Sequence, residues 1–106
     1  MVPLDQQALT AWIEAQLDQE AAALEIERER TGIAHPHDPL GGGRRNAYKL
    51  VLSRMKRGNL PELDDVEQLI SEFSTHPGLR GGTSQFRQGQ DDGLAAIRTK
   101  ATELMQ

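Results

Sequence analysis

The sequence predicts an all-α fold, a small bundle of about four helices joined by two glycine-rich loops. Apolar residues recur every three or four positions in four separate segments, as they do along the buried face of a helix. No segment shows the alternation of apolar and polar residues that is typical of a strand. Glycine and proline gather in residues 31–43 and 75–83, which we expect to be loops. The helices predicted in this single domain cover residues 5–30, 44–57, 61–74 and 84–105.

The first predicted helix, residues 5–30, is long and acidic. The residues that keep one face are Leu9, Ile13, Leu17 and Leu24. Asp5 suits the N-cap, and Gly32 suits the stop. A separate acidic strip follows the helix; its members are Glu14, Asp18, Glu25 and Glu29. We expect this strip to match a basic strip on the second helix if the two helices pack antiparallel.

The second predicted helix, residues 44–57, is basic and amphipathic. Its apolar stripe consists of Ala47, Tyr48, Val51, Leu52 and Met55. Residues 41–58 contain six basic residues and no acid, and like charges four residues apart repel one another. We therefore expect an acidic surface to face this helix. The residues predicted to bind a partner are Arg45, Lys49, Lys56 and Arg57.

The third and fourth predicted helices complete the bundle. The connection between residues 57 and 61 is short, so we expect the third helix to lie beside the second. In the fourth helix, Thr83 or Ser84 suits the N-cap. Gly89 and Gly93 lie four residues apart inside it. Either another backbone approaches these glycines closely, or the helix begins near Asp91.

The composition favours a protein that acts by binding. The chain has 106 residues, of which only 4% are aromatic, so its core is thin and a protein partner or a homo-oligomer is expected to complete it. No cysteine is present, which excludes disulfides, thiolate nucleophiles and cysteine-type zinc sites. We find no signal peptide and no apolar stretch of membrane-spanning length. These observations predict a soluble cytoplasmic protein that does not enter a membrane.

The inventory of reactive groups predicts no enzyme, metal or cofactor. The sequence contains no nucleophile motif, no phosphate-binding loop of the Walker type and no HExxH. His35, His37 and Asp38, with distant His76, offer imidazole and carboxylate ligands. They lie in proline-rich segments that lack the rigid spacing of a metal site. Solvated loop histidines are the simpler interpretation.

Two predicted helix starts combine glycine with arginine. Free backbone N–H groups, a positive dipole end and a guanidinium together favour a phosphate or carboxylate. If both starts converge, a nucleotide or another small anion fits between them; the alternative is that the glycines only make turns. The residues predicted for this anion site are Gly42, Gly43, Arg44, Arg80, Gly81 and Gly82.

The basic helix also raises the question of nucleic acid. A protein that binds duplex DNA through a helix-turn-helix would use the third helix for recognition. The phosphates of the DNA would repel the acidic residues of that helix, which are Glu62, Asp64, Asp65, Glu67 and Glu72. The overall pI of about 5.3 is far from that of a dedicated nucleic-acid binder. Contact with nucleic acid is therefore considered only through the basic helix.

Two short sequence patterns carry a resemblance to known proteins. The first is R-x-x-A-Y-x-x-V-L, here one residue tighter between Arg45 and Ala47; the second is F-x-x-G-x-x-D-G-L-x-x-A-I. The matching residues are Arg45, Ala47, Tyr48, Val51, Leu52, Phe86, Gly89, Asp92, Gly93, Leu94, Ala96 and Ile97. In these patterns the chain resembles the small all-helical accessory proteins of bacteriophages that infect high-GC hosts. The resemblance implies a binding protein in the host cytoplasm, either a modulator or inhibitor of a host or defence complex, or a small structural or assembly factor.

Overall fold

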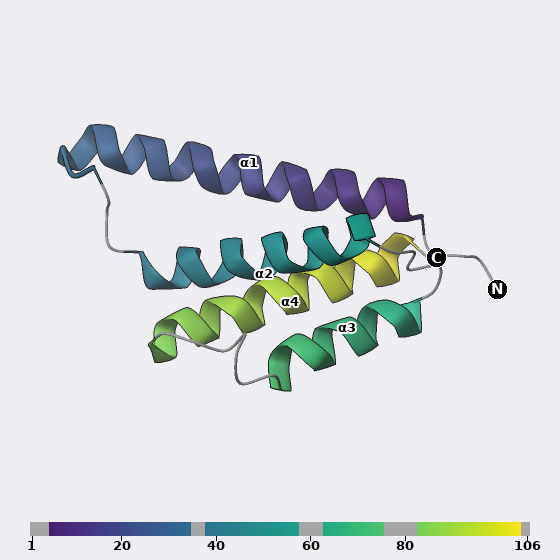
Figure 1. Cartoon of the computed structure of the whole chain (residues 1–106). Helices are drawn as coiled ribbons and strands as arrows, with labels where there is room; N and C mark the ends of the chain where they lie inside the picture. Colours follow the sequence, from purple (N-terminus) through teal and green to yellow (C-terminus); the bar gives the residue numbers. More distant parts are fainter. Residues whose placement is uncertain (1–4, 35–37, 58–62, 76–82, 105–106) are drawn as a thin grey trace.

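The computed structural model of the chain describes residues 5–34, 38–57, 63–75 and 83–104. In these ranges it contains no strand, and the predicted all-α bundle is confirmed. Its helices are α1 (Gln6–Thr31), α2 (Pro39–Arg57), α3 (Leu63–Thr75) and α4 (Ser84–Leu104). Successive helices run in alternating directions, so α2 and α4 run parallel to each other (Figure 1).

Both ends of α1 follow the sequence signals. The carboxylate of Asp5 accepts a hydrogen bond from the N–H of Ala8 at 3.0 Å, which caps the first turn. Gly32 takes the left-handed conformation with φ 72°, and its N–H bonds the carbonyl of Arg28 at 2.8 Å. The observed helix lies within one residue of the predicted range at each end.

The start of α2 corrects the prediction. The helix begins at Pro39, five residues before the predicted start, so residues 39–43 are helical rather than part of a loop. Proline suits a first helical turn, and Asp38 caps the helix by accepting the N–H of Gly41 at 3.0 Å. Glycine is a poor helix former, but packing against another helix outweighs that local preference.

That packing is the close contact of α2 with α4. A β-carbon on Gly43 would overlap the carbonyl oxygen of Phe86, and one on Gly89 would lie 2.9 Å from the carbonyl carbon of Leu40. The backbones of the two helices therefore touch where their glycines meet. Of the two interpretations of Gly89 and Gly93, the close approach is the correct one, because α4 already begins at Ser84.

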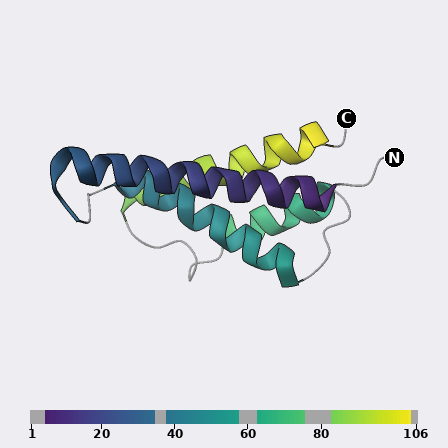
Figure 2. The same ribbon diagram turned by 90° about the horizontal axis from the view of Figure 1, so that it is seen from above.

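The core lies between the two parallel helices and their neighbours. Trp12 of α1 meets Tyr48 of α2 edge to face, with ring centroids 6.1 Å apart and an interplanar angle of 89°. From above, α1 lies over α2 and α4 (Figure 2). The buried apolar residues are Leu9, Ile13, Ala47, Tyr48, Val51, Met55, Val66, Leu69, Ile70, Leu94, Ile97 and Ala101.

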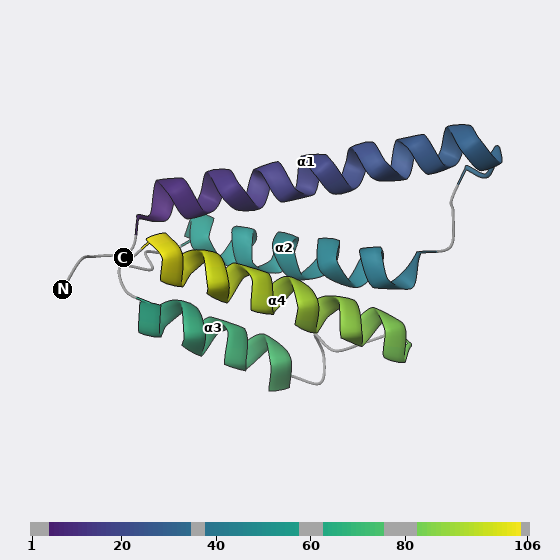
Figure 3. The same ribbon diagram turned by 180° about the vertical axis from the view of Figure 1, so that it is seen from behind.

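The helix α3 packs on α4 rather than on α2. We expected α2 and α3 to be neighbours because their connection is short, but the principal partner of α3 is α4 (Figure 3). Arg54 of α2 and Glu72 of α3 approach only to 3.9 Å. The intimate glycine contact of α2 with α4 places α4 beside α2 in the position that we had assigned to α3.

Candidate functional site

The second half of α1 has little support from the rest of the protein. Leu9 and Ile13 are the buried residues of this helix, and Leu17 packs partly against the core. No side chain from residue 18 to residue 31 is fully buried. This segment, which we call the arm, extends past the start of α2 (Figures 1 and 3). Because helices in proteins owe most of their stability to packing, an arm of this length without buried side chains gains little stability from the rest of the protein.

A groove of about 500 Å³ separates the arm from the beginning of α2. The residues of α1 that line it lie on one face of the helix and continue the stripe that Leu9 and Ile13 begin in the core. The groove therefore lies where the core-facing side of α1 extends beyond the residues that pack against it. Its lining consists of Glu20, Ala23, Leu24, Glu27, Thr31, Ile33, Asp38 and Arg44.

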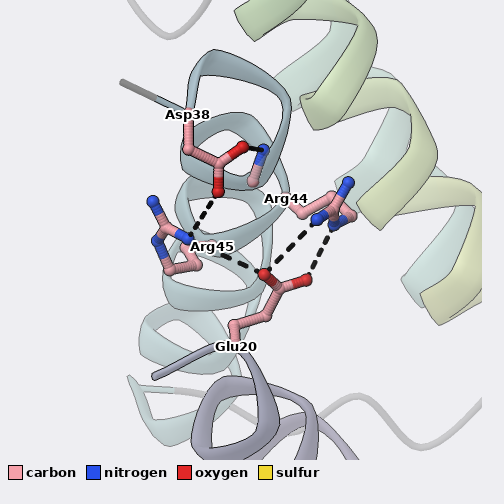
Figure 4. Close-up of polar contacts among 5 residues, drawn as sticks. Glu20, Asp38, Arg44 and Arg45 are labelled. Atoms are coloured by element: carbon pink, nitrogen blue, oxygen red, sulfur yellow. Dashed lines mark hydrogen bonds and ion pairs between the residues drawn. The ribbon is translucent and has the colours of Figure 1, made fainter. Parts of the chain in front are cut away.

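An ion-pair cluster contributes Glu20, Asp38 and Arg44 to the lining of the groove (Figure 4). Arg44 donates from Nε to Glu20 at 2.7 Å, and its second nitrogen lies 3.4 Å from the other oxygen. Arg45 lies 3.7 Å from Glu20 and 3.4 Å from Asp38. Only 17% of the Glu20 side chain is exposed. The cluster thus joins α1 to the first turns of α2 through one carboxylate.

The charges of this cluster stabilise one another. The hydrogen bond to Glu20 raises the pKa of Arg44, although desolvation of the guanidinium acts in the opposite direction. Asp38 is fixed independently, because its other oxygen accepts the N–H of Gly41. Both arginines and both carboxylates therefore have partners, and Arg45 has two of them.

The remaining ion pairs of the arm stay within it. Arg30 donates two hydrogen bonds to Glu27, and this interaction lowers the pKa of Glu27. Arg28 pairs with Glu25 at 3.1 Å and also bonds the carbonyl of Ala34 at 2.9 Å. Among the described residues, the ionic links between the arm and α2 all pass through Glu20.

Large apolar side chains are exposed where α1 ends and α2 begins. Ile26 is 65% exposed, Ile33 is 53% exposed and Leu40 is 37% exposed. Ile33 lines the groove, whereas Ile26 belongs to a different face of the arm and does not. This end of the molecule therefore combines exposed apolar surface with a cavity.

The structure divides the predicted basic site. Arg45 belongs to the ion-pair cluster, and the other three residues are exposed on α2. Lys56 lies 3.9 Å from Glu14, as the antiparallel matching of the two strips predicts. Lys49 and Arg57 have no ion-pair partner among the described residues. The acidic strip is divided too, because Glu25 pairs within the arm instead of reaching α2.

The basis of the predicted anion site on α2 is wrong. Gly42 and Gly43 lie inside the helix instead of at its first free N–H groups, and Arg44 holds Glu20. The N-terminus of α2 already receives a negative charge, the carboxylate of Asp38. The negative charge at this helix start is therefore a side chain of the protein itself. Arg80, Gly81 and Gly82 lie outside the described residues.

Two further features bear on the predicted classes. In the described ranges, no group of three or more histidine, cysteine, aspartate or glutamate side chains is arranged to hold a metal ion. The histidines considered as ligands, His35, His37 and His76, fall outside those ranges. No helix in the described part of the chain is long and apolar enough to cross a bilayer.

Comparison of the chain with protein-family models, with curated proteins and with solved structures found no match. The groove residues Glu20, Glu27 and Ile33 were not predicted as a site. A signal for the two glutamates exists in the sequence, because they lie at the helical spacing of the stripe that holds Leu9, Ile13, Leu17 and Leu24. Polar residues at apolar positions of a stripe indicate where a helix leaves its core.

Proposed function

We propose that this protein is a non-enzymatic helical interaction module that binds a partner protein along the groove beneath the arm. The observation that carries the proposal is that the inward face of α1 continues past the core into a groove of about 500 Å³. A helix or extended segment laid into such a groove is a common mode of recognition. The partner would supply the packing that the arm lacks.

The lining of the groove indicates the chemistry of the partner. Ala23, Leu24 and Ile33 give an apolar surface, and the three carboxylates of the lining each pair with an arginine of the chain itself. Aliphatic side chains match this surface, and basic residues beside them would take the place of those arginines at the carboxylates. We therefore propose a partner segment that carries lysine or arginine next to apolar anchors.

A protein partner is favoured over nucleic acid by the surroundings of the basic face of α2. Lys56 has Glu14 at 3.9 Å on one side, and Arg54 has Glu72 at 3.9 Å on the other. A polyanion laid on this face would meet the acids of both neighbouring helices. The exposed cations Lys49 and Arg57 would then contribute to steering an acidic part of the partner rather than to holding a duplex.

The resemblance to phage accessory proteins gives the proposal its biological context. A chain of this kind would act in the host cytoplasm as a modulator or inhibitor of a host or defence complex, or as an assembly factor. The alternative partner of the groove is a second copy of this chain. The mass of the purified protein in solution distinguishes a heterologous partner from a second copy of the chain.

The test compares two isoleucines at the same end of the molecule. Affinity capture from candidate host lysates would use the wild-type chain, Ile33→Glu in the groove, and Ile26→Glu on the other face as the matched control. We expect one captured protein to be retained by the wild type and Ile26→Glu and to lose at least tenfold affinity for Ile33→Glu, measured by calorimetry with the purified partner. Equal affinity for all three variants would overturn the proposal.

Light scattering on the purified chain, at low and high salt, assigns the partner. A monomer under both conditions is the result expected for a heterologous partner. A dimer that Ile33→Glu dissociates would show that the groove receives a second copy. A dimer that Ile33→Glu leaves intact, together with no groove-dependent capture, would contradict the assignment of the groove as the binding surface.

A further inference from the structure

We infer that Glu20 is a charge latch that sets the position of the arm: its ion pairs with Arg44 and Arg45 hold the arm against α2, and their loss lets the arm move away and widens the groove. This inference concerns the regulation of the site described above, and its consequence for binding rests on the proposed function. Its geometry stands independently of any partner.

Packing contributes little to the attachment of the arm. Residues 18–31 contribute no fully buried side chain, and Leu24, the apolar residue that would continue the core stripe, lines the groove instead. The close-up shows Glu20 reaching from α1 between the two arginines of α2 (Figure 4). The distances of 2.7 Å to Arg44 and 3.7 Å to Arg45 make this carboxylate the ionic attachment of the arm to α2 among the described residues.

The latch is able to open because its charges remain partly in contact with solvent. The side chain of Arg44 is 35% exposed and that of Arg45 is 21% exposed. Ion pairs in such positions are weakened by dissolved salt, whose screening length is about 8 Å at physiological ionic strength. Breaking these ion pairs costs less free energy than separating buried apolar side chains along the same stretch of helix.

Loss of the latch leaves no charge stranded. Without Glu20, Arg45 keeps Asp38 at 3.4 Å, and Asp38 keeps its hydrogen bond to the N–H of Gly41. Arg44 is exposed enough to be hydrated. A Glu20→Gln variant should therefore fold, with its core between α2 and α4 unchanged, because Glu20 does not belong to the buried apolar core.

The consequence for the proposed function is a change in apparent affinity. If the partner segment enters the widened groove, its affinity is reduced by the fraction of molecules that are closed. Opening the latch raises the apparent affinity in proportion to the increase in the fraction of open molecules. A basic partner would also compete directly with Arg44 and Arg45 for Glu20.

The experiment measures the arm directly. The chain has no cysteine, so Glu29→Cys on the arm and Gln85→Cys at the start of α4 can carry one spin label each, both at exposed positions. Pulsed electron spin resonance then gives the distribution of distances between them. We expect a narrow distribution for the labelled chain at low salt, and a shift to longer, broader distances at high salt and in Glu20→Gln at either salt.

The matched control is Glu25→Gln, which removes an ion pair of the same arm that does not reach α2. It should keep the narrow distribution. An unchanged distribution in Glu20→Gln and at high salt would overturn the latch, and a shift of equal size in Glu25→Gln would assign the motion to general loosening of the helix. Because the isolated chain is used, failure of the latch is distinguishable from failure of the proposed function, which shows only as loss of partner binding.

Discussion

Gly43 of α2 lies directly against the carbonyl oxygen of Phe86 in α4, with no room for a β-carbon between the two helices. We predict that Gly43→Ala lowers the free energy of unfolding by about 2 kcal/mol, because the added methyl group forces the two backbones apart and overpacking of this kind exceeds the gain in helix propensity. Denaturant unfolding followed by circular dichroism measures this change.

The adjacent glycine provides the control. A β-carbon on Gly42 would lie 3.7 Å from the ring of Phe86, an ordinary van der Waals contact. Gly42→Ala is therefore expected to raise the free energy of unfolding by up to about 1 kcal/mol through helix propensity alone. If the two variants changed stability by the same amount and in the same direction, the close approach of α2 and α4 would be refuted.

The pair formed by Glu20 and Arg44 should show energetic coupling. A double-mutant cycle with Glu20→Gln and Arg44→Gln is expected to give a coupling free energy of about 1 to 2 kcal/mol, because the hydrogen bond is short and Glu20 is shielded from solvent. The exposed pair of Glu25 and Arg28 serves as the reference, with about 0.3 kcal/mol. Equal coupling in the two cycles would contradict a special role for Glu20.

Arg45 and Lys49 belong to the same predicted basic strip, but we expect their substitution to change the stability of the protein by different amounts. Arg45→Glu places a third carboxylate beside Glu20 and Asp38, and we expect it to destabilise the fold by about 1 to 2 kcal/mol. Lys49→Glu should change the free energy of unfolding by less than about 0.5 kcal/mol, because Lys49 has no ion-pair partner in the described residues. Thermal unfolding of the two variants at low salt measures both changes in stability. A larger destabilisation by Lys49→Glu than by Arg45→Glu would contradict the assignment of Arg45 to the ion-pair cluster.

The sequence was sufficient to predict the elements but not their arrangement. The period of the apolar stripes indicated four helices, and the caps at Asp5, Gly32 and Thr83 are local signals whose hydrogen bonds are observed. The start of α2 was missed because three consecutive glycines read locally as a loop. Only the approach of α4, which is far away in the sequence, makes glycine favourable there.

The site was harder to predict for a related reason. The charges of Arg45, Lys49 and Lys56 look alike on a helical wheel, and only the tertiary structure shows that Arg45 lies beside Glu20 and Asp38. The start of α2, where we expected a bound anion, is capped by the side chain of Asp38. The glutamates in the apolar stripe of α1 indicate where the helix leaves its core, but the groove also depends on where α2 begins relative to that point, which only the tertiary structure shows.

The burial of Tyr48 predicts a loss of stability at alkaline pH. Burial raises the pKa of Tyr48, the charge of Glu20 raises it further, and Arg44 opposes the shift. A raised pKa means that the folded protein holds the phenolic proton more tightly than the unfolded chain does. The stability that protonated Tyr48 contributes is therefore fully present below the pKa of the tyrosine in the unfolded chain, about 10. It is lost as the pH rises from there through the pKa of Tyr48 in the folded protein.

Two measurements check this prediction. Tyr48 is the single tyrosine of the chain, so the ultraviolet absorbance of phenolate reports its ionisation without interference from other tyrosines. Unfolding of the wild type and of Tyr48→Phe between neutral and alkaline pH should show a steeper loss in the wild type. Parallel pH profiles for the two proteins, or a phenol that ionises as in a free peptide, would be the contrary result.

Hydrogen exchange of the intact chain tests the central claim, that the arm is a helix without a core of its own and is available to a partner. We predict that the amides of residues 20–31 exchange at least about tenfold faster than those of residues 9–17, which corresponds to a local opening about 1.4 kcal/mol easier than that of the packed half of α1. Uniform protection along α1, with both halves exchanging only through global unfolding, would contradict the account, because the arm would then be an integral part of the core.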